Sequence, residues 1–326
     1  MNQLYPLKFY PLFKDKIWGG QKIKQQFGLD SSPLPNCGEA WVLSGVDGNE
    51  SVVKDGWLKG NNINELVSVF MDELVGEKVF EKHRDQFPIL IKLIDSNQWL
   101  SIQVHPDDKL AQKRHGGSGK TEMWYVLQAD AGAQLISGFN QHVTPEKYVE
   151  LLKNNTLPTV MNFIDVAAGD VFYMPAGRVH ALGPGVLLAE IQQTSDITYR
   201  IYDWGRVDEK GNSRELHTEL ALDAIDFEPH NEYKTQVIAG KDKPTTLANS
   251  QYFTVRLIDL DNPYTYQSEG IDSFVVYLCV GGEVHISHDG GTNRLSAGEC
   301  LLVPAIIRHF TIAPKPKAQL LEVFCS

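Results

Sequence analysis

A twelve-residue pattern that occurs twice constrains the fold of this chain more than any other feature of the sequence. Residues 169–180 are GDVFYMPAGRVH and residues 298–309 are GECLLVPAIIRH, so a glycine, a proline and a histidine stand at the same offsets in both copies. A strand-like segment precedes each copy, MWYVLQADAGAQLI in the first case and FVVYLCVGGEVHI in the second. This self-similarity indicates an approximate internal duplication and predicts two related β units.

Short apolar runs separated by Gly, Pro, Asn and Asp make up most of the remaining sequence. Runs of this length and composition are typical of β-strands, and many of them in succession are typical of a sandwich or a closed barrel. We therefore expect a mainly β protein. The predicted strands are 87–95, 99–105, 121–129, 133–139, 169–175, 185–193, 254–260, 274–282, 283–288, 298–304 and 318–324.

Helical periodicity is confined to three segments, which we expect to be helices packed beside the β core. They are residues 62–83, residues 144–155 with Thr144 as the N-cap, and residues 213–227. The sequence near residue 240 is polar and linker-like. These features predict a first domain over 1–240 that contains the helical insertions and a second, degenerate domain over 241–326.

Composition and charge exclude several classes of partner. The net charge of -11 argues against a nucleic-acid surface, which needs clustered basic residues to neutralise phosphates. No stretch approaches the ~20 apolar residues of a membrane span, and the first residues lack the apolar core of a signal peptide. The 4 cysteines form no CxxC pair, which favours free thiols in a reducing compartment. We expect a cytoplasmic protein that binds neither nucleic acid nor a membrane.

The first copy of the repeated pattern resembles a signature of the cupin superfamily. That signature, G(x)5PxG(x)2H, is filled by Gly169, Pro175, Gly177 and His180. The glycines permit a tight turn, the proline fixes the approach to it, and the histidine is aimed into the mouth of the barrel. The resemblance implies two jelly-roll β-barrel domains with a few helical insertions.

Three further residues can join His180 in a metal site. Gln103 and His105 are two apart on a predicted strand and therefore point to the same face, while Glu122 opens a neighbouring strand. A lone strand histidine is more often a hydrogen-bonded core residue, but four such groups on inward faces favour a ligand set. Two imidazoles, a carboxylate and a carbonyl oxygen suit a divalent cation, either Zn²⁺ with an open position or non-haem iron.

The second copy of the pattern keeps His309 but lacks the other features of a metal site. Ile306 replaces the turn glycine, and no Gln-x-His pair precedes this copy. His285 and His288 are three apart, so they would face opposite sides of a strand. The sequence predicts one metal site per chain.

Longer motifs resemble those of the type I mannose-6-phosphate isomerases, in their short bacterial form. The motifs are WLSIQVHPDD, GKTEMWYVL, GDVFYMPAGRVHAL and EIQQTSDITYRIYDWGR in this order, together with IWGG and CGEAWVLSG near the start. The resemblance covers about residues 10–210 and implies a zinc enzyme that interconverts mannose 6-phosphate and fructose 6-phosphate. It also implies that one Zn²⁺ per chain is held by the residues named above, Gln103, His105, Glu122 and His180.

The resemblance further implies the residues that surround the substrate. Arg200 matches the essential arginine of the family, and Arg206 keeps a positive charge where the family often has lysine. The other implied pocket residues are Trp18, Lys92, Ser101, Lys120 and Asp196. The expected partner is a small sugar phosphate, and the chain is expected to be a monomer or a homodimer.

The chemistry of an aldose–ketose isomerisation assigns tasks to these side chains. The reaction passes through an enediolate, whose developing charge Zn²⁺ or a nearby cation such as Lys120 can stabilise. Arg200 and Arg206, with the hydroxyl of Ser101, are candidates to hold the phosphate, because a guanidinium can grip it in a bidentate way. Arg200 could instead order the enediolate, and Asp196 could assist ring opening or orient Arg200.

Two other functions are compatible with a cupin that has this ligand set. One is a sugar-binding protein without catalysis, which would keep the metal ligands but lack the cations of the pocket. The other is an iron-dependent oxygenase, which would leave the SDITYRIYDWGR motif without a function. The presence of Lys92, Lys120, Arg200 and Arg206 favours the isomerase.

Overall fold

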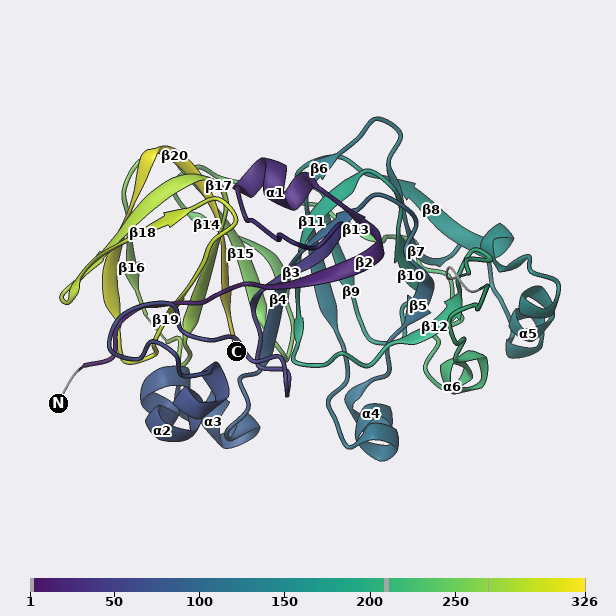
Figure 1. Cartoon of the computed structure of the whole chain (residues 1–326), viewed down its shortest axis with the longest axis horizontal. Coiled ribbons are helices and arrows are strands. Elements are labelled where there is room, and N and C mark those ends of the chain that lie inside the picture. The colour runs from purple at the N-terminus through teal and green to yellow at the C-terminus, as the bar shows by residue number, and fades with distance from the viewer. Residues whose placement is uncertain (1–2, 208–210, 269, 326) are drawn as a thin grey trace.

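The computed structural model describes residues 3–207, 211–268 and 270–325 and shows a mainly β molecule with two units side by side (Figure 1). The first unit contains a seven-stranded sheet with the strand order β13-β9-β6-β11-β4-β2-β3, in which the named strands pair antiparallel. Its strands are β2 (Leu12–Gly20), β3 (Cys37–Leu43), β4 (Ile89–Ser96), β6 (Glu122–Ala129), β9 (Val171–Met174), β11 (Val186–Gln193) and β13 (Lys234–Thr235).

A five-stranded sheet with the order β12-β5-β10-β7-β8 completes the first unit. Its strands are β5 (Ile102–Val104), β7 (Gln134–Phe139), β8 (Met161–Asp165), β10 (His180–Leu182) and β12 (Tyr199–Tyr202). A buried cluster that includes Trp124 of β6, Leu135 of β7 and Leu188 of β11 joins the two sheets. The predicted strands of this half are confirmed, and the interior between its sheets is where the candidate ligands lie.

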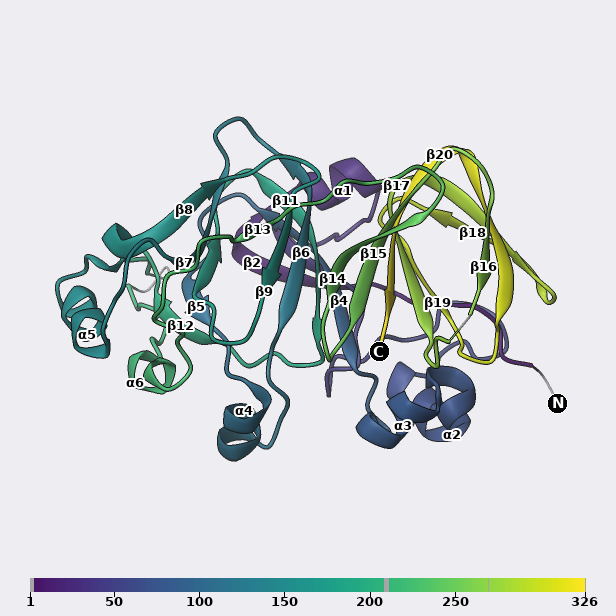
Figure 2. The ribbon, with the colours of Figure 1, turned by 180° about the vertical axis from the view of Figure 1, so that it is seen from behind.

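The second unit is an eight-stranded sheet with the path β1-β19-β17-β20-β15-β14, to which β16 and β18 are added. Its strands are β1 (Leu7–Lys8), β14 (Pro244–Asn249), β15 (Thr254–Leu260), β16 (Tyr264–Gln267), β17 (Val275–His288), β18 (Gly291–Ser296), β19 (Cys300–Val303) and β20 (His309–Phe324). The two strands predicted over 274–288 form the single long strand β17. Figure 2 shows from behind that the chain crosses from β13 in the first unit to β14 in the second.

Apolar packing joins the two units through one face of each. Leu187, Ala189 and Ile191 of β11 belong to the same buried cluster as Val276 and Leu321 of the second unit. The seven-stranded sheet is therefore buried on both faces, which explains the continuous apolar runs of β4 and β11. Strand β1 pairs with β19, so the chain enters the second unit before it builds the first. The division near residue 240 stays a prediction.

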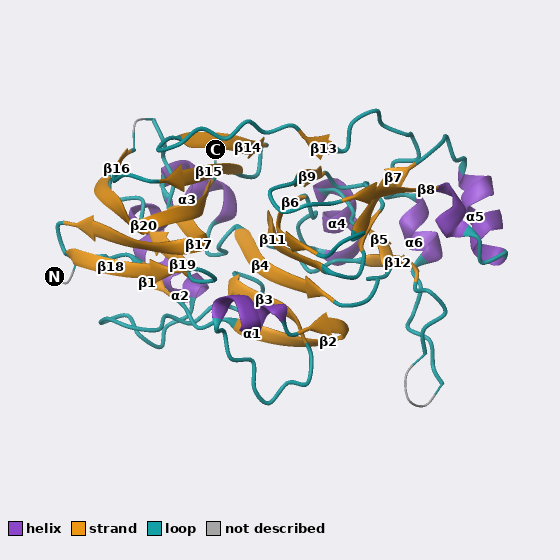
Figure 3. Cartoon of the chain, turned by 90° about the horizontal axis from the view of Figure 1, so that it is seen from above, coloured by secondary structure: helices purple, strands orange, loops and turns teal. Residues whose placement is uncertain are grey.

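The helices lie at the periphery of the sheets: Figure 1 shows several of them below the sheets, and Figure 3 shows two at one end of the molecule. In place of the predicted helix over 62–83 there are two helices, α2 (Ile63–Val75) and α3 (Glu77–His83). They are separated by Gly76, which has φ 92° and packs so closely on the second unit that a Cβ would come within 2.5 Å of the carbonyl oxygen of Asp272. The remaining elements are α1 (Lys22–Phe27), α4 (Asp108–His115), α5 (Pro145–Lys153), α6 (Thr218–Leu222) and the 3-10 helix η1 (Leu157–Val160).

The prediction for 144–155 is confirmed as α5, with Thr144 as the N-cap. The helix predicted over 213–227 is wrong for most of its length, because only Thr218–Leu222 is helical. Backbone groups of this segment instead bind β12: the carbonyl of Glu215 accepts from the guanidinium of Arg200, and the amide of His217 donates to the carbonyl of Arg200. Helices α1 and α4 were not predicted. Among the described residues, no helix combines the length and apolar character that a membrane span requires.

Candidate metal centre and cavity

The four predicted metal ligands lie together inside the first unit. Gln103 in β5 is directly opposite His180, the first residue of β10, in the register of the five-stranded sheet. His105 follows β5, and Glu122 is the first residue of β6 in the facing sheet. His105, Glu122 and His180 each offer a ligand atom within 4.8 Å of the others, and all three are buried. The set thus combines residues from both sheets of the first unit.

The two imidazole rings are oriented by backbone carbonyl groups. Nδ1 of His105 lies 2.9 Å from the carbonyl oxygen of Ile197, and Nδ1 of His180 lies 2.8 Å from that of Arg178. Each Nδ1 donates to its carbonyl, which leaves Nε2 of each ring facing the carboxylate of Glu122 at 3.6 Å and 3.2 Å. A backbone acceptor on the far nitrogen is the usual arrangement for a metal-binding histidine.

The protonation states of these buried side chains favour a bound cation. Burial lowers the pKa of His105 well below its usual value, and burial lowers that of His180 to about 4, so both rings stay neutral. Burial and the nearby charge of Glu190 raise the pKa of Glu122 to about 7, although Lys120 and Lys92 act to lower it. Neither buried carboxylate oxygen of Glu122 accepts a hydrogen bond, although Oε2 forms an ion pair with Lys120. A divalent cation would satisfy these oxygens and both Nε2 atoms, so the donor set fits a metal ion.

The ammonium group of Lys120 lies against the same set. Its Nζ is 3.3 Å from Oε2 of Glu122 and 3.3 Å from Nε2 of His105, and the side chain is buried. Lys120 is two residues before Glu122 in the extended chain, so its side chain points to the same side as that of Glu122. The positive charge thus sits where a bound ligand would meet the metal.

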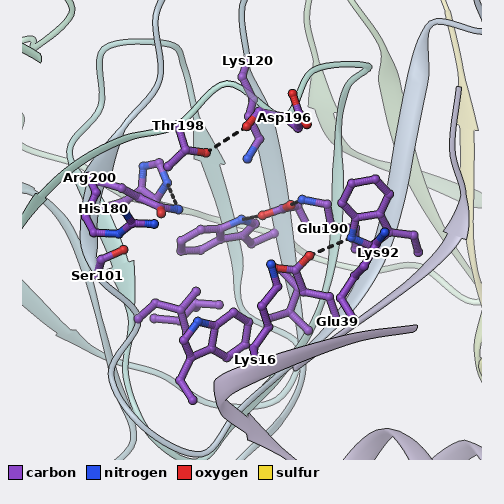
Figure 4. Close-up of a pocket in the computed structure, with 18 of the residues that line it drawn as sticks. Lys16, Glu39, Lys92, Ser101, Lys120, His180, Glu190, Asp196, Thr198 and Arg200 are labelled. Atoms are coloured by element: carbon purple, nitrogen blue, oxygen red, sulfur yellow. Dashed lines mark hydrogen bonds and ion pairs between the residues drawn. The ribbon is translucent and has the colours of Figure 1, made fainter. Parts of the chain in front are cut away.

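A cavity of about 500 Å³ reaches this set at Gln103, His180 and Lys120 (Figure 4). Its wall contains acidic, basic, hydroxyl and indole groups, an unusual concentration of polar side chains for the inside of a β unit. The lining residues are Lys14, Lys16, Trp18, Glu39, Trp41, Asn49, Lys92, Ile94, Leu100, Ser101, Gln103, Lys120, Trp124, His180, Leu182, Glu190, Asp196, Thr198, Arg200 and Arg214. Of the sequence-predicted pocket residues, Trp18, Lys92, Ser101, Lys120, Asp196 and Arg200 are in this wall.

Three side chains of the seven-stranded sheet form a buried row in the cavity wall, with a carboxylate between an ammonium group and an indole. Glu190 of β11 lies opposite Lys92 of β4 on one side and Trp124 of β6 on the other. Its carboxylate accepts from Nζ of Lys92 at 2.7 Å and from the indole of Trp124 at 2.9 Å. Burial acts to raise the pKa of Glu190, but Lys92 and Lys120 lower it to about 2. Glu190 is therefore an ionised carboxylate within the cavity.

A second buried carboxylate, Glu39 of β3, extends this row. It accepts from the indole of Trp41 at 2.7 Å and faces the ammonium of Lys16 at 3.4 Å. Burial acts to raise the pKa of Glu39, but Lys92 and Lys16 keep it below its usual value. The face of Trp41 also lies 5.3 Å from the ammonium of Lys92. Acidic and basic groups thus alternate along this wall and suit a polar ligand with several hydroxyl groups.

The opposite side of the cavity is formed by the segment around β12. Arg200 lies opposite Gln103 in the register and lines the cavity, as Ser101 and Thr198 do. One guanidinium nitrogen of Arg200 donates to the carbonyl of Glu215, while its Nε is buried without a partner. The carboxylate side chain of Asp196 is exposed at the same side of the cavity, and the hydroxyl of Thr198 donates to its carbonyl. Arg200 therefore has donor capacity left for a ligand.

The structure does not bring Arg206 to the cavity wall. Its guanidinium pairs with Asp203 and donates to the carbonyl of Trp99 at 2.6 Å. Arg214 lines the cavity instead and is held by the same carboxylate, to which its Nε donates at 2.8 Å and its Nη2 at 2.5 Å. The buried Asp203 thus gathers two arginines and presents one of them to the cavity. Arg206 is thus not among the residues that line the cavity, whereas Arg214 is, and the roles of both toward a ligand stay predictions.

Sequence reasoning missed several cavity residues, some of which left a signal. Glu190 was missed, but it and the predicted Lys92 are lone charges within the apolar runs GVLLAEIQQ and FPILIKLID, and such residues in two buried strands are expected to pair. Glu39 stands within one of the motifs that carried the resemblance. Lys14, Lys16, Asn49 and Arg214 left no such signal, because they lie outside the motifs and nothing in their local sequence places them at the cavity.

Comparisons with known proteins agree with this arrangement. Residues 7–129 match the family model of the phosphomannose isomerase type I catalytic domain, and residues 243–323 match that of the mannose-6-phosphate isomerase cupin domain. The chain is 34% identical over 306 residues to the mannose-6-phosphate isomerase of Streptococcus mutans, with 94% of each chain covered. It is 32% identical over 321 residues to the mannose-6-phosphate isomerase ManA of Bacillus subtilis, with 94% of this chain and 95% of the relative covered.

A solved structure extends the agreement to the whole fold. The crystal structure of the mannose 6-phosphate isomerase from Bacillus subtilis superposes with a TM-score of 0.87 at 32% sequence identity. The superposition covers 98% of this chain and 99% of the other. Both units, and not only the first one, are therefore common to the two molecules.

Proposed function

The chain belongs to the type I mannose-6-phosphate isomerase family, and from this premise we propose that it interconverts mannose 6-phosphate and fructose 6-phosphate with one bound Zn²⁺. The observation that supports this most is the buried His105, Glu122 and His180 set, which opens with Lys120 on a polar cavity. The free thiols of all four cysteines agree with a reducing, cytoplasmic location.

Zn²⁺ would be held by Nε2 of His105, Nε2 of His180 and the carboxylate of Glu122. Gln103 would be the fourth ligand: its amide nitrogen now faces Nε2 of His180 at 3.4 Å, and a half-turn of the amide would present the carbonyl oxygen instead. When bound, the ion would act as a Lewis acid toward the sugar oxygens. Tetrahedral Zn²⁺ sites commonly combine ligands of these types.

The chain's own cations would stabilise the enediolate. Transfer of a proton between C1 and C2 places negative charge on the two neighbouring oxygens. The ammonium of Lys120 is fixed at the edge of the ligand set, and the guanidinium of Arg200 faces the cavity from β12. Because both groups are positioned before the reaction, they stabilise the developing charge without reorganisation.

Two carboxylates of the cavity wall are suited to proton handling. Glu190 is buried and ionised beside Lys92, and we propose it as the acceptor of the C2 proton. Asp196 is exposed at the cavity mouth and can exchange protons with water, which suits it to assist ring opening. The variants Glu190→Gln and Asp196→Asn would separate these roles, because only the first would slow exchange of the C2 hydrogen with solvent.

The phosphate would be held near β12. Arg214 and Arg200, with the hydroxyl of Ser101, line this side of the cavity. Asp203 neutralises one charge of the local arginines and leaves a net positive charge for a phosphate dianion. This assignment takes Arg214 as a phosphate ligand in place of Arg206, which acts behind the wall by holding Asp203.

A coupled assay tests the proposed function. The sample with Zn²⁺ is expected to convert mannose 6-phosphate to fructose 6-phosphate, to lose this activity on chelation and to recover it when Zn²⁺ is returned. Other hexose 6-phosphates in the same assay would define the specificity. A sample that binds the sugar phosphate without turnover would support a binding protein, and turnover that needs iron and O₂ would support an oxygenase.

A further inference from the structure

We infer that the second β unit positions Lys120 through a chain of hydrogen bonds that begins at Tyr252 and passes through Asp108. Tyr252 lies between β14 and β15, whereas Asp108 is the first residue of α4 in the first unit. The inference rests on the role proposed above for Lys120. It concerns three positioning residues, Tyr252, Asp108 and Gln193, none of which lines the cavity.

The backbone on both sides of Lys120 is tied to Asp108. Oδ1 of Asp108 accepts from the amide of Gly119 at 2.8 Å and from the side-chain amide of Gln193 at 2.9 Å. The side-chain oxygen of Gln193 in turn accepts from the amide of Thr121 at 2.9 Å. The residues before and after Lys120 are therefore held by one carboxylate, directly on one side and through Gln193 on the other.

Close packing reinforces these bonds. The amide of Lys120 donates to the carbonyl of Pro106 at 3.1 Å, just before α4. A Cβ on Gly119 would lie 2.5 Å from the backbone nitrogen of Asp108, so the segment packs directly on the first turn of α4. This path delivers the ammonium of Lys120 to 3.3 Å from both Glu122 and His105. A shift of Asp108 would move the lysine relative to both groups.

The second unit holds the other oxygen of Asp108. The hydroxyl of Tyr252 donates to Oδ2 of Asp108 at 2.8 Å. Helix α3 fixes the loop that carries Tyr252, because Nζ of Lys82 donates to the carbonyl of Gln251 at 3.1 Å and lies 5.6 Å from the centre of the Tyr252 ring. Both oxygens of Asp108 are thus engaged, one by each unit, which fixes the rotation of the carboxylate.

The second unit therefore has a function that requires no metal of its own. It supplies the hydroxyl group of Tyr252, which orients the carboxylate of Asp108, and this carboxylate in turn holds the backbone around Lys120. Catalytic groups are effective only when they are held close to their productive geometry, so the loss of this support should lower kcat more than it alters binding.

The experiment compares Tyr252→Phe and Asp108→Asn in the zinc-loaded enzyme. Tyr252→Phe removes one hydrogen bond and is expected to lower kcat about two- to tenfold, with KM, zinc content and melting temperature unchanged. Asp108→Asn should lower kcat at least as much. The double variant should fall no further than Asp108→Asn alone, because both act through one carboxylate. Tyr5→Phe is the control, since its hydroxyl also donates at 2.8 Å but to the backbone carbonyl of Asp55, and it should leave kcat unchanged.

Lys120→Met separates failure of this inference from failure of the proposed function. Full turnover in Lys120→Met would refute the catalytic role of the lysine. Impaired turnover in Lys120→Met together with wild-type kcat in Tyr252→Phe would overturn the positioning role of Tyr252. A fully additive double variant would also overturn it, because Tyr252 would then act independently of Asp108.

Discussion

The two β units share a twelve-residue turn pattern, but the histidines that close the two copies have opposite environments. His180 is 1% exposed and faces Glu122, whereas His309 is exposed at the start of β20. Gly177 adopts a left-handed φ of 89° before His180, while Ile306 at the same offset is 53% exposed. The pattern therefore determines the turn, and the residues of neighbouring strands determine whether the histidine meets a metal site.

The buried glutamates of the two units show the same contrast. In the second unit, Glu322 accepts from the hydroxyl of Tyr277 at 2.8 Å and faces the guanidinium of Arg256 at 3.4 Å. In the first unit, Glu122 faces the ammonium of Lys120 at 3.3 Å, but neither of its oxygens accepts a hydrogen bond. A buried carboxylate that accepts hydrogen bonds from the protein is satisfied by the fold, whereas one that accepts none is free to bind a metal cation. Packed side chains thus fill the interior of the second unit, whereas the interior of the first unit contains the candidate metal site.

Removal of one arginine from each unit should give the largest difference in kcat. Arg200→Ala is expected to lower kcat about 10²- to 10³-fold with zinc retained, because a donor to the developing charge is lost. Arg256→Ala removes a guanidinium that contacts Glu322 in the second unit and should leave kcat unchanged. Steady-state kinetics with zinc analysis measures both. Wild-type kcat in Arg200→Ala would contradict the role given to this arginine.

A smaller effect should distinguish the two arginines held by Asp203. Arg214→Ala should raise KM for mannose 6-phosphate about 10- to 100-fold, as expected for the loss of a charged hydrogen bond to phosphate. It should weaken inhibition by inorganic phosphate by a similar factor. Arg206→Ala should change both values only a few-fold, because its guanidinium supports Asp203 from behind. The opposite order of effects would place the phosphate on Arg206.

The smallest effect concerns the stability of the second unit. Burial raises the pKa of Glu322, although Tyr277 and Arg256 oppose the shift. At pH values below about 4.3, the pKa of a glutamate in an unfolded chain, Glu322 is protonated in both the folded and the unfolded protein. The raised pKa then has no effect on stability. Above the raised folded pKa, the wild type bears the full cost of the buried charge, so its stability relative to Glu322→Gln should fall as pH rises.

Thermal melts of both proteins at pH 4 and pH 8 measure this change. The difference in melting temperature should move toward the variant by about 1–3 °C between the two pH values, with isomerase activity kept in Glu322→Gln. A difference that stays constant with pH would show that Glu322 does not titrate differently on folding.

Local patterns in the sequence predicted the parts of the site that depend on short-range geometry. The spacing of Gln103 and His105 predicted a shared strand face, and the turn before His180 predicted an inward histidine; the structure brings both to Glu122. Their roles as zinc ligands stay predictions. Strands β4, β5, β6, β7, β9 and β11 were predictable for the same reason, because alternation and apolar runs are local properties, whereas β2, β3, β8, β10, β12 and β13 were not predicted.

Contacts between distant segments decided what the sequence could not predict. The path of residues 211–217 depends on Asp203, which binds Arg214, and on Arg200, which donates to the carbonyl of Glu215. Neither the place of Arg214 in the cavity wall nor the shortness of α6 was therefore visible locally. The break between α2 and α3 depends on Asp272, whose carboxylate accepts from the amide of Glu77 at 3.1 Å. The helix pattern of that segment continues through the break.

Zinc content and isomerase turnover, measured on the same samples of wild type, His180→Ala and His309→Ala, test the central claim most directly. The wild type and His309→Ala are expected to hold one Zn²⁺ per chain and to turn over mannose 6-phosphate at equal rates. His180→Ala is expected to lose both the zinc and the turnover while it keeps its fold. Retained zinc and turnover in His180→Ala, or their loss in His309→Ala, would contradict the placement of the metal site in the first unit.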